Sequence, residues 1–141
     1  MKAKLRGDWE HKPIGHAVDY YMQRDTFLDA WGPLDIAATS QWGFFNTVLT
    51  ASHNPNPGHF GEVVFRPVVV RDHAWITTNC TLYNCEIGEH AIVAAGSVVC
   101  SRDVPAWTIV EGNPAQIIAR YDHEHQRWVY QEPEALPRRR A

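Results

Sequence analysis

Residues Ile87–Val99, with the sequence IGEHAIVAAGSVV, decide the fold. In this stretch Ile87, Val93 and Val99 are six residues apart, and a small residue follows each of the first two. A helix would repeat its apolar residues every 3.6 positions and a half-buried strand every second position, so neither explains a step of six. A hexapeptide period is typical of a parallel β-helix, in which three six-residue units make one coil of about 18 residues.

The step of six continues toward the N-terminus in two further runs. The runs are Ile36, Trp42, Val48 and then Val64, Val70, Ile76, Leu82. The step shortens to five between Leu82 and Ile87, which indicates a tight corner at Asn84–Cys85. Several phased runs favour a β-helix over the alternative, an antiparallel sandwich of short strands.

The chain divides into three parts. Residues 1–33 form an N-terminal segment in which His16–Trp31 has the pattern of a short helix, with a strand as the alternative because of its aromatic residues. Residues 34–120 form the β-helix, interrupted by a loop over 53–63 whose prolines and glycines exclude regular strand. Residues 121–141 form a tail that contains a closing helix over Tyr121–Glu134. Repeat proteins often carry binding loops as insertions, so the loop that starts at His53 is the first place to look for function.

The composition is that of one soluble domain. The chain has 141 residues, is 45% hydrophobic and carries a net charge of -3, which argues against binding nucleic acid through bulk charge. It has no apolar run near the ~20 residues of a membrane span and no pattern of a signal peptide. Three cysteines without a Cys-x-x-Cys pattern indicate reduced thiols, so we expect a cytoplasmic protein.

Pro67–Arg120, together with a short segment before it, resembles a known family. The motifs that carry the resemblance are Thr50–Pro55, Val68–Ile76, Ile87–Val99, Asp103–Pro105 and Gly112–Ala115. They resemble the hexapeptide-repeat acyltransferases, and within them the sugar O-acetyltransferases of the maltose, galactoside and colanic-acid type. The resemblance implies a left-handed parallel β-helix, and an enzyme that transfers an acetyl group from acetyl-CoA to a sugar hydroxyl or similar small acceptor.

The resemblance also implies catalytic residues. His53 matches the family's general base, which takes the proton from the acceptor hydroxyl while both substrates are bound. The backbone amide of Thr78 matches the donor that stabilises the oxyanion. Trp75 matches the tryptophan that lines the acceptor site, although packing between subunits is an equal alternative. His59 lies in the same loop as His53 and is a further candidate for the acceptor site.

In the family, coenzyme A lies in a groove between two subunits, so the resemblance implies a homotrimer with three sites. The backbone of Ala95, Gly96 and Ser97 matches the positions that meet the pantetheine arm. Arg102 and Arg120 are candidates for the phosphates of the cofactor, and Asn113 borders the groove. None of the cysteines matches a nucleophile, and we expect Cys100 to be structural.

Two other functions remain as alternatives. One is a non-catalytic β-helix that serves as a scaffold or binding module. The other is a γ-class carbonic anhydrase, but two of its three zinc-binding histidines would fall near Thr78 and Tyr83, and neither residue is a zinc ligand. We therefore expect no metal site.

Overall fold

The computed structural model describes residues 4–6 and 26–139 of the chain. Every element of regular secondary structure in these residues is a β-strand, which confirms the predicted all-β class. The same residues contain no helix that is long and apolar enough to cross a membrane.

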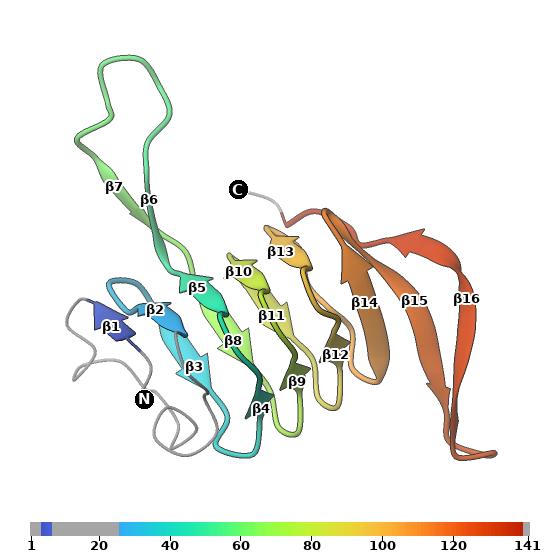
Figure 1. Ribbon diagram of the computed structural model, residues 1–141. Helices are drawn as coiled ribbons and strands as arrows, with labels where there is room; N and C mark the ends of the chain where they lie inside the picture. Colours follow the sequence, from blue (N-terminus) through green and yellow to red (C-terminus); the bar gives the residue numbers. More distant parts are fainter. Residues whose placement is uncertain (1–3, 7–25, 140–141) are drawn as a thin grey trace.

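Three parallel sheets form the faces of a coiled stack (Figure 1). Face A contains β1 (Lys4–Arg6), β2 (Phe27–Asp29), β5 (Thr47–Leu49), β10 (Thr81–Tyr83) and β13 (Val98–Cys100). Face B contains β3 (Leu34–Ile36), β8 (Val68–Val70) and β11 (Cys85–Ile87). Face C begins with β4 (Gln41–Trp42), β9 (Trp75–Ile76) and β12 (Ile92–Val93). The chain visits the faces in the order A, B, C, and we name each corner by the two faces that it joins.

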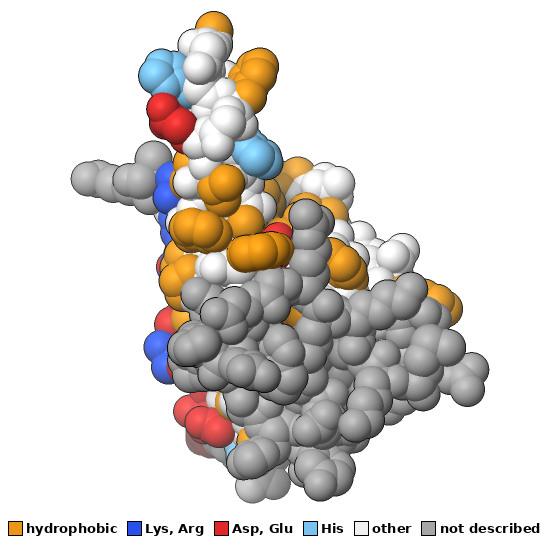
Figure 2. Space-filling view, turned by 90° about the vertical axis from the view of Figure 1, so that its left-hand side faces the viewer, with side chains coloured by type: hydrophobic (Ala, Val, Ile, Leu, Met, Phe, Trp, Pro, Cys, Tyr) orange, Lys and Arg blue, Asp and Glu red, His pale blue; other side chains and the backbone are white. Residues whose placement is uncertain are grey.

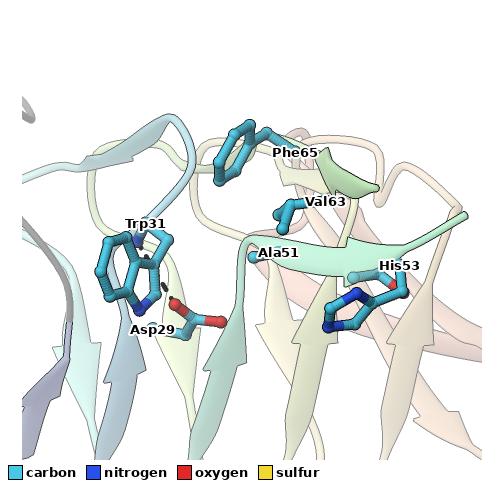
Figure 3. A pocket seen from close by; sticks show the side chains of 7 residues that line it. Asp29, Trp31, Ala51, His53, Val63 and Phe65 are labelled. Carbon is cyan, nitrogen blue, oxygen red and sulfur yellow. Dashed lines mark hydrogen bonds between the residues drawn. The ribbon is translucent and has the colours of Figure 1, made fainter. Parts of the chain in front are cut away.

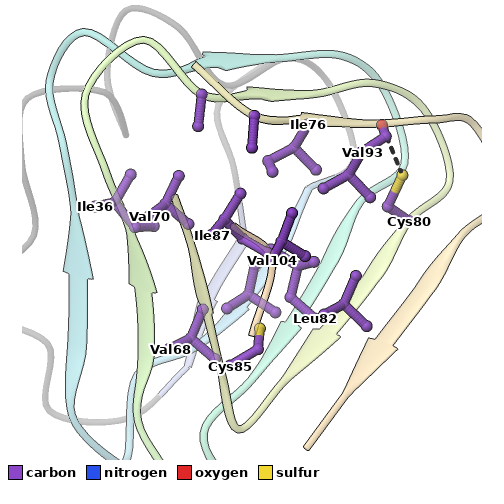
Figure 4. Close-up of a cluster of buried hydrophobic side chains, with 14 of the residues drawn as sticks. Ile36, Val68, Val70, Ile76, Cys80, Leu82, Cys85, Ile87, Val93 and Val104 are labelled. Carbon is purple, nitrogen blue, oxygen red and sulfur yellow. Dashed lines mark hydrogen bonds between the residues drawn. The ribbon is translucent and has the colours of Figure 1, made fainter. Parts of the chain in front are cut away.

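The core confirms the hexapeptide pattern. The predicted inward residues that lie in coil strands are all buried, and they are Ile36, Trp42, Val48, Val70, Ile76, Leu82, Ile87, Val93 and Val99. Figure 4 shows many of these side chains converging between the faces. The prediction for Val64 is wrong, because this residue lies outside the coil in an antiparallel hairpin and is only half-buried.

One coil takes 17 residues, one fewer than expected, because the A–B corner is short. Asn84 alone separates β10 from β11, and its backbone adopts a φ of 48°. Its side-chain amide donates a hydrogen bond to the Ser101 hydroxyl, 17 residues onward and one coil away. The tight corner predicted at Asn84–Cys85 is therefore confirmed. Asparagine suits this corner, since it tolerates the left-handed conformation better than most residues.

The predicted C-terminal helix is wrong. β14 (Thr108–Gly112) continues face C, and β15 (Ala115–Asp122) and β16 (Arg127–Ala135) extend it as antiparallel strands. In β15, alternate residues are buried against the last coil, which is the period of a strand. Pro133 lies in β16 at the sheet edge, where a missing backbone donor is tolerated.

The N-terminal helix predicted over His16–Trp31 falls largely outside the described residues. Its described end is a strand instead, because Phe27–Asp29 forms β2 and pairs in parallel with β5. Leu28 is fully buried beneath that pair. Residues 26–33 therefore belong to the coil.

A hairpin leaves the stack at the A–B corner that follows β5 (Figure 1). It consists of β6 (Ala51–His53) and β7 (Val63–Phe65), with the irregular residues 54–62 at its tip. The amide of Arg66 donates a hydrogen bond to the Thr50 carbonyl at 2.8 Å, which closes the neck of the excursion. The insertion predicted at His53 thus stands off the coil without changing the course of the faces.

Candidate active site

An open hollow of about 430 Å³ lies where the hairpin meets face A. It is lined by Asp29, Trp31, Ala51, Ser52, His53, Val63 and Phe65. Figure 3 shows Asp29 and Trp31 on the side of β2, His53 on β6, and Val63 and Phe65 above. The volume is within the range of small-molecule sites, about 300–1,000 Å³.

Two titratable side chains line this hollow, and of these His53 is exposed to solvent whereas Asp29 is buried. It ends β6, paired with Val63 across the hairpin, so the ladder fixes its backbone. Among the described residues, none forms a hydrogen bond with its imidazole. Both ring nitrogens are therefore available to a substrate, as a general base requires.

A threonine holds the opposite wall of the hollow in place. The buried Thr50 hydroxyl donates to the Asp29 carbonyl and accepts a hydrogen bond from the Gly32 amide at 2.8 Å. The Asp29 carboxylate in turn accepts from the Trp31 amide at 3.3 Å. A Cβ added to Gly32 would lie 2.4 Å from the Thr50 carbonyl oxygen, so only glycine fits there.

Sequence reasoning assigned no role to Asp29. Asp29 lies on β2, which pairs with β5 through Leu28 and Val48. Because the separation of these two residues is not a multiple of six, the hexapeptide period did not reach the strand of Asp29. The signal that could have found it was the apolar pair Phe27–Leu28, which directly precedes Asp29.

His59 does not line the hollow. It lies at the hairpin tip, where its Nδ1 is 2.6 Å from a carboxylate oxygen of Glu62. Hydrogen bonds from His59 and then from Asn54 lower the pKa of Glu62. In this structure His59 stabilises the loop beyond the hollow.

Apolar side chains are exposed on the hairpin and at its base. Figure 2 shows hydrophobic side chains gathered along this projection. Phe60 is 65% exposed, and Val63, Phe65 and Trp31 are each about half exposed. Exposed apolar side chains so close together indicate a surface that contacts a ligand or another protein.

The residues expected to hold the cofactor and the oxyanion stack at the C–A corner. The amide of Gly96 donates to the Thr78 carbonyl at 2.9 Å, so the two corners lie one above the other. Within the described chain, the amides of Thr78 and Ala95 donate to no other residue. Ser97 is buried, and its hydroxyl donates to the Ala94 carbonyl at 2.6 Å, which fixes the corner. Gly96 has a φ of 75° and open space where a side chain would be, so its backbone is accessible.

His53 and Thr78 do not meet within one chain. Thr78 precedes β10 and lies at the corner where the chain enters face A, whereas His53 follows β5 and lies beyond the corner where the chain leaves face A. β5 and β10 are adjacent and in register, so the width of face A separates the two corners. The structure therefore places the candidate base and the candidate oxyanion donor on opposite sides of one face.

Two of the other predicted residues share a second hollow, of about 270 Å³. Arg102 and Asn113 line it together with Cys100 and Arg138. The Arg102 guanidinium donates to the Leu136 carbonyl at 2.5 Å, so it also anchors the C-terminal segment. Arg120 lies apart on β15, where it forms an exposed ion pair with Glu134 at 2.5 Å.

Trp75 projects from face C and is 45% exposed. It lines a third hollow that shares no lining residue with the hollow of His53. Within one chain, the structure does not bring Trp75 to the candidate base.

The buried cysteines are poor nucleophiles. Burial raises the pKa of the Cys80 thiol and raises that of the Cys85 thiol to about 12. Cys100 is exposed. Because a thiolate is the reactive form, the two buried thiols stay inert at neutral pH. Residues 26–139 contain no group of three His, Cys, Asp or Glu side chains that could hold a metal ion.

Solved structures with the same arrangement of coils identify the fold. A hexapeptide-repeat acetyltransferase from Vibrio cholerae, solved with acetyl coenzyme A, matches with a TM-score of 0.73 and 28% identity over 84% of this chain and 64% of its own. The structural neighbours are hexapeptide-repeat acetyltransferases. A maltose O-acetyltransferase from Clostridium difficile matches with a TM-score of 0.73 and 21% identity, over 86% of this chain and 66% of its own, and at that identity shows the fold alone.

A curated relative matches a shorter part of the chain. It is a 2,3,4,5-tetrahydropyridine-2,6-dicarboxylate N-acetyltransferase from Staphylococcus aureus, 45% identical over 53 residues. These residues are 37% of this chain, and they span only 22% of the relative. No protein-family model matches the chain.

Proposed function

We propose that this protein is an acetyl-CoA-dependent acetyltransferase that acts on a hydroxyl of a sugar or similar small acceptor. The observation that carries the proposal is His53, whose unpartnered imidazole and the Asp29 carboxylate line one hollow at an insertion of the coil. The hexapeptide-repeat acetyltransferase from Vibrio cholerae, solved with acetyl coenzyme A, supports the cofactor.

His53 acts as the general base in the proposed reaction. It takes the proton of the acceptor hydroxyl as the oxygen attacks the thioester carbonyl, and the tetrahedral intermediate then expels the thiolate of coenzyme A. That thiolate recovers the proton from the imidazolium. Asp29 accepts a hydrogen bond from a second group of the acceptor and orients it, since its carboxylate lies in the same hollow.

The C–A corner supplies the cofactor site. The accessible backbone at Ala95 and Gly96 suits a pantetheine arm, because no side chain keeps the ligand away. The uncommitted amide of Thr78, directly alongside in the stack, suits the oxyanion. Arg102 and Asn113 line the neighbouring hollow, and a guanidinium suits the phosphates of the cofactor.

A homotrimer completes this site. One chain places His53 and Thr78 at opposite ends of the strands of face A, so the base of one copy must meet the amide of the next. The exposed apolar side chains of the hairpin are suited to cover such a neighbour. A cyclic trimer has heterologous contacts of this kind and would hold three equal sites.

The first test measures acetyl-CoA binding and turnover together. Calorimetry gives binding, and a colorimetric thiol reagent follows release of coenzyme A across a panel of sugars and alcohols. The variant His53→Ala should bind acetyl-CoA normally and lose about 10²–10⁴-fold in kcat. His125→Ala, which removes another exposed histidine, serves as the matched control. A protein that binds no acetyl-CoA at millimolar concentration would be a scaffold instead.

Mixing two inactive variants tests the shared site. His53→Ala lacks the base, and Thr78→Pro lacks the backbone N–H. In a trimer assembled at random from equal amounts, about a quarter of the interfaces combine an intact His53 with an intact Thr78. Activity should therefore return to about a quarter of the wild-type level after joint refolding. Mixed trimers that remain inactive would contradict the shared site.

A further inference from the structure

Three aromatic side chains form a stacked column along the B–C corner. His73, His90 and Trp107 occupy the same place in three successive coils. The ring centroids of His73 and His90 are 4.7 Å apart, and those of His90 and Trp107 are 4.0 Å apart with an angle of only 14° between planes. We call these three residues the ring column.

The ring column uses left-handed backbone positions. Its φ angles are 59°, 56° and 57°, all in the left-handed region. A bulky residue such as tryptophan is an outlier in that region, whereas asparagine and histidine adopt it more readily. Asn79 and Asn84 occupy comparable positions at the other two corners. Trp107 thus stands where asparagine would fit the backbone better, which points to a use for its ring.

The ring column forms one wall of an aromatic groove on face C. The groove has a volume of about 440 Å³ and is lined by Gln41, His73, Trp75, His90, Ile92, Trp107, Tyr121 and Trp128. Gln41, Trp75 and Ile92 form its floor, since they are paired in register on β4, β9 and β12. Tyr121 and Trp128 close one end from β15 and β16, with their rings edge to face at 5.2 Å.

The chemistry of the lining selects among ligands. The groove has no Lys, Arg, Asp or Glu among its described lining residues, so it offers no charge to a phosphate or a carboxylate. Its polar groups are the Gln41 amide, the ring nitrogens of His73 and His90, the Tyr121 hydroxyl and the indole N–H groups of its tryptophans, so it can both donate and accept hydrogen bonds. Large aromatic surfaces edged by neutral polar groups suit a ligand that is apolar on one side and hydroxylated at its rim.

We infer that the face C groove binds a neutral saccharide. The C–H face of a pyranose ring would lie against the exposed indole of Trp75, and its hydroxyls would reach Gln41 and the imidazoles. The length of the ring column along the stack favours an oligosaccharide over a single sugar. The groove is on the face opposite the A–B corner that carries the hairpin, so it is separate from the hollow of His53 within one chain. The inference does not depend on acetyl transfer.

Asparagine variants test the groove without disturbing the backbone. Trp107→Asn and His90→Asn remove rings from positions where asparagine is favoured, so the coil should fold normally. Phe45→Asn is the matched control, because Phe45 also has a left-handed backbone (φ 58°) and lies at the C–A corner away from the groove. Maltotriose, cellotriose and tri-N-acetylchitotriose are titrated by calorimetry and by saturation-transfer NMR, without acetyl-CoA.

At least one of these trisaccharides should bind the wild type and Phe45→Asn equally, and Trp107→Asn at least tenfold more weakly. His53→Ala should bind it as the wild type does, so failure of the acetyltransferase proposal would leave this result intact. Three outcomes would overturn the inference. They are no binding of any trisaccharide at millimolar concentration, binding unchanged by Trp107→Asn, and ring-dependent binding of tetramethylammonium alone, which would indicate a cation site. Dissociation of an oligomer by Trp107→Asn in sedimentation would also overturn it, because the groove would then be an interface between copies.

Discussion

Gly32 couples the fold of the coil to the hollow of His53, and its replacement by alanine tests this coupling. The added Cβ would lie 2.4 Å from the Thr50 carbonyl oxygen and 2.9 Å from the Thr50 Cβ. Both atoms belong to the buried residue that holds Asp29 and begins the hairpin. The methyl group can be accommodated only if the corner moves away from Thr50.

The cost follows from two effects. Forcing a methyl group into a packed site costs about 1–3 kcal/mol. The movement also weakens the two hydrogen bonds of the Thr50 hydroxyl, each worth about 0.5–1.5 kcal/mol. Gly32→Ala should therefore lower the free energy of unfolding by about 2–6 kcal/mol. Because Asp29 and Trp31 move with the corner, the proposed acetyl transfer should fall as well.

Urea unfolding followed by fluorescence measures the effect, which should move the midpoint by about 1 M or more. Gly61→Ala is the control, because the same methyl group would have no atom within 4 Å. A glycine replaced at a compatible site should stabilise the protein by up to about 1 kcal/mol, through the unfolded chain. If Gly32→Ala unfolds at the same urea concentration as Gly61→Ala, the reasoning about this corner is wrong.

Four further tests have defined outcomes. Leu82→Ala, in the centre of the core, should cost about 2–5 kcal/mol in urea unfolding, and a cost under 1 kcal/mol would contradict the packing. Burial raises the pKa of the Cys85 thiol from 9.0 to about 12. The protonated thiol therefore contributes its full stabilisation of the fold below pH 9, and this stabilisation is lost as pH rises toward 12. Cys85→Ala should flatten that decline in stability. Cys100 should be the first thiol alkylated in the folded protein. Asp29→Asn should lower kcat by about ten- to a hundredfold with an unchanged unfolding midpoint, whereas full activity would remove Asp29 from the site.

The coil could be predicted from sequence because each inward residue repeats at short range. Ile87, Val93 and Val99 carry the period within a single coil. The step that is one residue shorter, around Asn84, marks the short corner. Val64 was misplaced because an apolar residue in a hairpin can fall into the phase of the coil by chance. Its strand pairs with Ala51–His53 rather than with a neighbouring coil, and such a pairing leaves no period in the sequence.

The candidate site could be predicted only in part. The break in the repeat pointed to His53, which lines a hollow at the base of the hairpin, and its role as general base stays a prediction. Asp29 and Trp31 reach the same hollow through the pairing of β2 with β5, a contact between distant segments. The C-terminal helix was wrong for a related reason, since the last coil provides β14 as an edge on which the following residues pair as strands.

The closed neck of the hairpin allows the loop at its tip to change without changing the coil. The hydrogen bond between Arg66 and Thr50 returns the chain to the corner it left, so β5 and β8 keep their places whatever lies between them. Residues 54–62 can thus lengthen, shorten or be exchanged at little cost, since closing a longer loop adds only about 0.6 kcal/mol per doubling of its length. The coil acts as a fixed frame, and the loop at the hairpin tip can change in length while the residues of β6 and β7 that line the hollow of His53 keep their places.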